Sequence, residues 1–92
     1  MSSFLIVRPM TIYLTERNLP GIKDEDLAAA QKKAIETAKA MTDAGTPIKY
    51  LKSDFTKETG RCVCSFEAPD ADAVKALNDT AKLPYERITK KP

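Results

Sequence analysis

The chain has 92 residues, which is too few for two domains that each bury a core, so a single domain spanning residues 1–92 is expected. Fifteen basic and thirteen acidic side chains give a formal net charge of +2, a balance that excludes the basic surface typical of proteins that bind nucleic acids or membranes. Histidine is absent, which removes the commonest metal ligand and the usual general base at neutral pH.

Residues 1–9 contain one apolar run, Phe4–Val7, which is shorter than the core of a secretory signal and much shorter than a membrane span. We expect these residues to form an N-terminal extension or an extra strand. The two cysteines, Cys62 and Cys64, are separated by one residue and do not make the disulfide framework of a secreted domain. A soluble, cytoplasmic protein is therefore expected.

Residues 11–17 are rich in β-branched and aromatic side chains and predict the first strand. Alternation places Ile12, Leu14 and Glu16 on one face of this strand and the remaining residues on the other.

Pro20 and Gly21 predict a turn, and a long amphipathic helix is expected to follow it. Asp24 is the expected N-cap, and Gly45 followed by Pro47 is expected to end the helix. The apolar stripe consists of residues spaced three and four apart: Leu27, Ala30, Ala34, Ile35, Ala38 and Met41.

Residues 48–55 and 61–67 predict two strands of a hairpin, with Gly60 in the connecting loop where left-handed backbone is wanted. A shorter helix is expected after Pro69, with Asp70 as its N-cap. Its buried edge comprises Val74, Leu77 and Ala81. Pro84 ends this helix, and residues 85–89 predict a short edge strand ahead of a frayed tail.

The order β, α, β, β, α, β is that of the ferredoxin-like α+β fold, a four-stranded antiparallel sheet with both helices on one face. Twelve alanines leave few large side chains for the core, and a domain of this size buries only roughly 60 to 65% of its unfolded surface. We therefore expect the bare face of the sheet to be covered by a second copy, in a homodimer of the α/β-barrel type.

Three segments carry a further resemblance: YLTERNLPG at residues 13–21, CSFEAPD at 64–70 and LPYERI at 83–88. They are similar to a family of small bacterial proteins of unknown function that includes a nickel-binding protein, and the resemblance covers about residues 10–89. It implies a ferredoxin-like fold, an intimate dimer and nickel held by histidines. The positions that align with those histidines hold Lys52 and Leu77, which do not bind nickel in that role, so no cofactor is expected.

Cys62 and Cys64 are the remaining candidate metal ligands, because a strand points both thiols to the same side. Their Cβ atoms are expected roughly 7 Å apart, too far for an unstrained disulfide, and a soft metal would need further ligands. The alternative is a buried structural pair beside Phe66. A reactive thiol at Cys64 needs a cation nearby, for which Lys49 and Arg61 are the nearest candidates.

Glu16 is the candidate catalytic residue, because it continues the apolar face of its strand. A carboxylate in an apolar setting can act as a general base or anchor a ligand. The alternative is an ion pair at the end of the strand, with Arg17, Arg61 or Arg87 as the partner.

Tyr13, Tyr50 and Phe66 complete the candidate ligand-binding set, together with Glu16 and Cys64. They line a small-molecule pocket, either between sheet and helices or across the dimer, or they form plain core.

Two functions are favoured by these patterns. The resemblance favours a small dimeric binding protein for a small ligand or a metal ion. The alternative is a small dimeric α/β-barrel enzyme that acts on an organic acid or a phenolic compound, with Glu16 as the general base. A structural protein whose dimer surface is its function is a third hypothesis.

Overall fold

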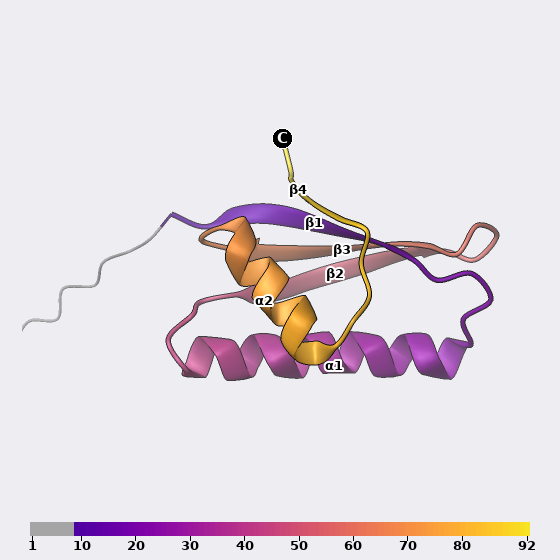
Figure 1. Cartoon of the computed structure of the whole chain (residues 1–92), viewed down its shortest axis with the longest axis horizontal. Helices are drawn as coiled ribbons and strands as arrows, with labels where there is room; N and C mark the ends of the chain where they lie inside the picture. Colours follow the sequence, from indigo (N-terminus) through magenta and orange to yellow (C-terminus); the bar gives the residue numbers. More distant parts are fainter. Residues whose placement is uncertain (1–8) are drawn as a thin grey trace, which may run out of the picture.

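The computed structural model describes residues 9–92 and consists of a four-stranded sheet that carries two helices on one face (Figure 1). The elements in chain order are β1 (Thr11–Asn18), α1 (Asp24–Asp43), β2 (Lys49–Thr56), β3 (Arg61–Ala68), α2 (Ala71–Ala81) and β4 (Arg87–Lys90). The strand order across the sheet is β2-β3-β1-β4, and every neighbouring pair is antiparallel. The predicted ferredoxin-like fold is confirmed.

We predicted an extension or an extra strand at residues 1–9, but residues 1–8 lie outside the described part of the chain. Pro9 has no regular secondary structure. Within residues 9–92, neither helix combines the length and apolar character that a bilayer crossing requires.

Helix α1 begins one residue earlier than expected. Lys23 is the N-cap and makes no side-chain capping bond, so the prediction of Asp24 as the N-cap was wrong. Asp24 is instead the first of three acidic residues in the opening turn. Their negative charges interact favourably with the positive end of the helix dipole. The inner face of α1 rests on Ala34 and Ala38, whereas Ile35, which the spacing assigns to the apolar stripe, is 49% exposed.

The second helix follows the expected pattern closely. The carboxylate of Asp70 accepts a hydrogen bond from the backbone N–H of Ala73 at 2.9 Å, which confirms the predicted N-cap. Its buried side includes the predicted Val74, Leu77 and Ala81. The last strand, β4, begins at Arg87, two residues later than predicted.

The β2–β3 hairpin turn packs against the segment that follows β1. Gly60 has a φ of +77°, the left-handed conformation expected there. Its carbonyl accepts a hydrogen bond from the N–H of Leu19 at 2.7 Å, and a Cβ on Gly60 would lie 2.5 Å from the backbone of Pro20. Glycine therefore serves both the turn and the close approach of two backbones.

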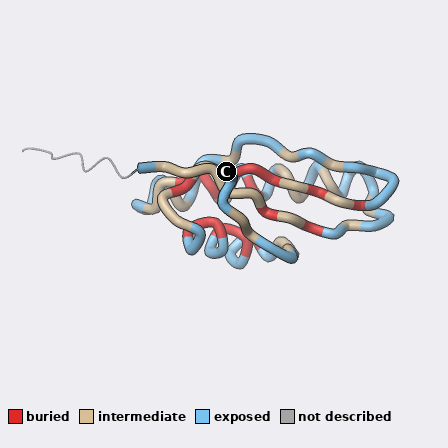
Figure 2. Tube along the Cα trace, turned by 90° about the horizontal axis from the view of Figure 1, so that it is seen from above, coloured by how far each residue is buried: buried red, intermediate tan, exposed pale blue. Residues whose placement is uncertain are grey.

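The core lies between the sheet and the helices, and short buried segments alternate with less buried ones along the strands (Figure 2). The β1–β3 register places Tyr13, Thr15 and Arg17 beside Phe66, Cys64 and Cys62 on the helix-facing side. The face formed by Ile12, Leu14 and Glu16 consequently points away from the helices. No helix of the described chain covers that face (Figure 1).

Candidate functional site

Polar and thiol side chains occupy the middle of the layer between the sheet and α1. β1 and β3 pair Thr15 with Cys64 and Arg17 with Cys62. Arg17 is 3% exposed, Cys62 1% and Cys64 4%, and both cysteines are free thiols. A guanidinium and two thiols therefore share the interior of a small domain, where unpaired charge is costly.

A chain of hydrogen bonds runs through this layer and ends at the thiols. The hydroxyl oxygen of Tyr50 lies 2.6 Å from that of Ser53, and the Ser53 oxygen lies 3.0 Å from Sγ of Cys64. Sγ of Cys62 lies 3.9 Å from Sγ of Cys64, within hydrogen-bond reach of sulfur. Cys64 is thus the point on which the donors converge.

A β-bulge in β2 makes this chain of hydrogen bonds geometrically feasible. Tyr50 is paired with Phe66 and Lys52 with Ser65, so Leu51 is an extra residue in the strand. Beyond the bulge the alternation is reversed, and Ser53 faces the helices together with Tyr50. Neither Ser53 nor the bulge was predicted, since nothing in the residue pattern of β2 marks them.

Among residues 9–92, Arg17 has no carboxylate partner of the kind that a buried guanidinium usually has. Its Nη1 donates a hydrogen bond to the carbonyl of Pro84 at 3.1 Å. Its Nη2 is buried and has no hydrogen-bond partner among residues 9–92. Among these residues no acidic side chain forms an ion pair with Arg17 either. The negative charge that balances this cation must come from elsewhere in the layer.

The hydrogen bonds set the ionisation of the two thiols. Hydrogen bonding from Cys62 lowers the pKa of Cys64 to about 5, helped by Ser53 and the guanidinium of Arg17 and opposed by burial. The same hydrogen bond and burial raise the pKa of Cys62. Burial likewise raises the pKa of the Tyr50 phenol. These shifts favour a thiol pair that shares one proton, with the negative charge on Cys64 rather than on Cys62 and next to the guanidinium of Arg17.

A narrow crevice reaches Arg17, Cys62 and Cys64 from the edge of the sheet–helix layer. Its other walls are the side chains of Leu19, Leu27, Ala30, Gln31, Ala34 and Leu83. The empty volume is about 240 Å³, part of it open to solvent, and the enclosed part has room for about one water-sized group. The enclosed end of the crevice has no room for a bulky group beside the thiols.

The prediction for the environment of the two cysteines was partly right. Their burial beside Phe66 is confirmed, with Phe66 fully buried. The expectation that Lys49 or Arg61 supplies the cation was wrong, because both belong to the opposite face of the sheet and Arg17 takes that place. Arg17 was not predicted here because the apolar side chains of β1 lie on the face of its neighbour Glu16, which favours burial of the other side of the strand.

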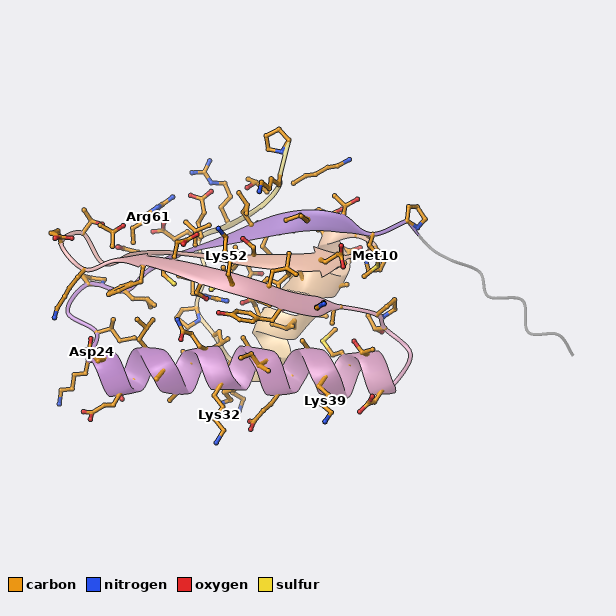
Figure 3. The ribbon with its side chains drawn as sticks, turned by 180° about the vertical axis from the view of Figure 1, so that it is seen from behind. Met10, Asp24, Lys32, Lys39, Lys52 and Arg61 are labelled. Atoms are coloured by element: carbon orange, nitrogen blue, oxygen red, sulfur yellow. The ribbon has the colours of Figure 1, made fainter. Side chains whose placement is uncertain are left out.

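Glu16 lies on the open face of the sheet, away from the thiols. Its carboxylate forms ion pairs with Arg61 and, at 3.2 Å, with Arg87, and Arg61 also contacts Glu86 at 3.3 Å. Figure 3 shows Arg61 and Lys52 projecting from the side of the sheet that faces away from α1. Of the partners considered for Glu16, Arg61 and Arg87 are therefore found and Arg17 is not.

The predicted ligand-binding residues are divided between the two faces. Phe66 lies between Tyr13 and Tyr50 in the sheet register, and its ring meets that of Tyr50 edge to face with centroids 5.7 Å apart. These aromatic residues and Cys64 lie on the helix-facing side, where they belong to the core or border it. Glu16 is not brought together with them.

The residues present do not fit a nickel ion. The whole sequence lacks histidine. Within the described range 9–92, no group of three or more Cys, Asp or Glu side chains is placed to hold a metal. The thiols lie beside a buried guanidinium, whose charge repels a divalent cation.

Fold and site together define a small ferredoxin-like protein with a buried thiol site. The chain belongs to the SCO4226-like family: the family model described as nickel responsive protein SCO4226-like matches residues 13–90. This match confirms the resemblance carried by the three sequence segments.

One solved structure shares the fold across nearly the whole domain. The crystal structure of SCO4226 from Streptomyces coelicolor A3(2) superposes with a TM-score of 0.75 at 18% sequence identity, covering 88% of this chain and 95% of that one. No curated protein matches the chain at a significant level.

Proposed function

We propose that the chain is a homodimeric, cytoplasmic binding protein whose ligand is a small hydrogen-bond acceptor bound by Arg17 in the crevice that reaches the thiols. The observation that carries this proposal is the buried Nη2 of Arg17, which makes no hydrogen bond of ordinary geometry in the described chain although the guanidinium acts on the nearby Cys64 thiol. Leaving such a donor unsatisfied costs roughly 1 to 3 kcal/mol, so a ligand that accepts its hydrogen bond recovers that free energy.

The dimensions and charge of the crevice restrict the ligand further. Its enclosed part accommodates about one water-sized group, so only one end of a small ligand fits there and the rest must lie in the open part of the crevice. The guanidinium favours an anion or a dipole with its negative end toward Arg17. With a ligand of this kind, the function of this chain would differ from the nickel response for which its family is described.

The open face of the sheet supports the homodimer. Ile12, Leu14 and Val63 lie on this face, partly exposed, and no helix of residues 9–92 covers it. A second sheet packed there would bury these side chains and complete the small core. Light scattering in solution tests the assembly: twice the chain mass is expected, and Leu14→Lys should give a folded monomer.

Azide, a small anion that does not react with thiols, is the probe for the ligand site. We expect it to raise the melting temperature of the native chain, and we expect Arg17→Gln to abolish that rise. Arg87→Gln is the matched control, because Arg87 lies on the open face. Metal analysis of untagged protein should show no nickel. Stoichiometric nickel uptake with no response to azide would contradict the proposal.

A further inference from the structure

We infer that Cys64 is a peroxide-reactive thiol, and that the crevice under α1 accommodates its sulfenic acid with the added oxygen hydrogen-bonded to Arg17. The inference rests on the proposed function for the location of the site and names a reactant for it, hydrogen peroxide. It does not require reversible binding of an anion.

The groups around Cys64 are arranged to stabilise a negative sulfur. Ser53, at 3.0 Å, and Cys62, at 3.9 Å, both have a proton to donate to it, and a thiolate can only accept. Tyr50 in turn can donate to Ser53. The guanidinium of Arg17 is the cation of the layer, and it acts on Cys64 from β1.

No opposing charge in the described crevice competes with this arrangement. The titratable and charged groups that face the sulfur are Arg17 from β1, Tyr50 from β2 by way of Ser53, and Cys62 from β3. The crevice walls contributed by α1 and by the segment after α2 are uncharged, and Gln31 is the polar member among them. These surroundings favour the thiolate form of Cys64, which is the form that attacks peroxide.

The oxidation balances with peroxide as the only co-reactant. The Cys64 thiolate attacks one oxygen of hydrogen peroxide, an S–O bond forms and the O–O bond breaks. The second oxygen leaves as hydroxide and takes up a proton to become water. Sulfur loses two electrons and peroxide gains them, which gives the first step of cysteine oxidation.

The product fits the space and the unused donor. One added oxygen needs about the volume of the water-sized space at the enclosed end of the crevice. Nη2 of Arg17, which has no partner among residues 9–92, is the donor available to that oxygen. Oxidation of a buried thiol usually disturbs packing, but here the oxygen supplies a missing hydrogen bond.

Cys62 is poorly placed to convert the sulfenic acid to a disulfide. Residues two apart on an extended strand have Cα atoms about 6.6 to 6.8 Å apart, at the upper limit for a disulfide. Their strand, β3, pairs on both sides, with β1 and with β2, so it cannot easily bend. The sulfenic acid persists until two equivalents of an external thiol reduce it, releasing water and the thiol's disulfide.

The pH dependence, more than the absolute rate, distinguishes this thiol from an ordinary one. A low pKa increases the thiolate fraction near neutral pH but also lowers nucleophilicity, and the two effects nearly cancel there. An ordinary thiol loses roughly 80-fold in thiolate between about pH 8 and pH 6. Cys64 should lose less than about threefold over the same range, because it stays ionised.

The test exposes the full native chain to hydrogen peroxide and stops the reaction in denaturant with dimedone, which traps sulfenic acid for peptide mass mapping. We expect the trapped adduct on Cys64 and not on Cys62, at a rate nearly constant from about pH 6 to pH 8. The bulky disulfide reagent DTNB should react at least about tenfold more slowly with the native than with the unfolded chain.

Variants separate the site from general oxidation. Cys64→Ser should abolish the adduct and Cys62→Ser should keep it. Ser53→Ala should slow oxidation near pH 6 by about two- to tenfold, because loss of one hydrogen bond to the thiolate lowers the ionised fraction. Ser65→Ala, on the opposite face of β3, is the matched control.

An adduct confined to Cys62, no adduct on folded protein, or a rate that falls with pH like that of free cysteine would each overturn the inference. The azide measurement is independent of these outcomes. If azide stabilises the chain but peroxide leaves Cys64 unchanged, the oxidation fails and the proposed binding function stands. If peroxide reacts with Cys64 as expected but azide has no effect, the proposed binding function fails and the oxidation stands.

Discussion

The hydroxyl oxygen of Tyr50 lies 2.6 Å from that of Ser53, although side chains three positions apart on a regular strand point to opposite faces. The bulge at Leu51 removes this conflict by inserting one residue between the paired positions of β2. Ser53 is thereby turned toward Cys64. The hydrogen bonds from Tyr50 to Ser53 and from Ser53 to Cys64 therefore depend on the extra residue, Leu51.

The first prediction concerns this hydrogen-bond chain. Ser53→Ala removes a donor to Cys64, so the pKa of Cys64 should rise by about one to two pH units, the equivalent of a hydrogen bond to a charged group. Tyr50→Phe acts only through Ser53 and should have a smaller effect. Thiolate absorbance near 240 nm measures both shifts, and an unchanged midpoint in Ser53→Ala would refute the proposed role of this serine.

The second prediction is that stability depends on pH although the chain lacks histidine. The folded-state pKa of Cys64 lies below its unfolded value, so its contribution is complete above the unfolded pKa and is lost as pH falls toward about 5. Cys62 is shifted upward, so its contribution is complete below its unfolded pKa and is lost as pH rises above that value. The free energy of unfolding should therefore increase from about pH 6 to pH 8 and decrease above about pH 9.

Urea unfolding under reducing conditions measures this dependence. One proton corresponds to at most about 1.4 kcal/mol per pH unit, so the gain from about pH 6 to pH 8 should be roughly 1 to 3 kcal/mol. The chain lacks histidine, the side chain whose ordinary pKa lies in this interval. Cys64→Ser should flatten the curve, and a flat curve for the native chain would contradict the assignment of the charge.

The third prediction concerns the contact between two turns. Gly60→Ala places a methyl group 2.5 Å from backbone atoms of Pro20 and forces alanine into left-handed backbone. We expect a loss of at least about 2 kcal/mol in the free energy of unfolding, since strain and clash act together. Gly45→Ala is the control: it shares the positive φ but meets no atom within 4 Å, so its loss should be clearly smaller. Equal losses of stability in the two variants would show that the backbone at Pro20 can move away from the added methyl group without a free-energy cost.

The fourth prediction concerns the cap of α2. Asp70→Ala removes the acceptor for the Ala73 N–H and should cost about 1 kcal/mol of stability. Asp72→Ala, in the first turn of the same helix, retains the cap and should cost only a few tenths of a kcal/mol. Chemical denaturation of both variants decides the point, and comparable costs would mean that charge near the helix end matters more than the capping bond.

Much of the fold follows from local sequence patterns. Asp70 and Gly60 act as their residue types predict, and the alternation of Cys62, Cys64 and Phe66 identifies one buried face of β3. The cap of α1 was misplaced because three consecutive acidic residues leave the first helical position ambiguous by residue type. Ile35 was wrongly assigned to the buried stripe of α1, because an apolar side chain on a helix does not always face the core.

The site was harder to predict for a physical reason. On β1, hydrophobicity favours burial of the face of Ile12 and Leu14, yet the helices cover the face with Thr15 and Arg17. A buried arginine needs an anion to balance it, and the group placed to supply that anion is the Cys64 thiol, on a strand distant in sequence. The residue pattern of one strand contains no information about such a pairing.

We infer that the native chain holds one thiolate, on Cys64, beside the buried guanidinium of Arg17, and the proposed oxidation depends on it. The most direct test is a pH titration of the native, reduced chain followed by thiolate absorbance near 240 nm. We predict one thiolate appearing with a midpoint of about 5 and the second thiol remaining protonated beyond its ordinary range. Two thiols that ionise together at or above the ordinary cysteine pKa, about 8.5, would contradict this assignment.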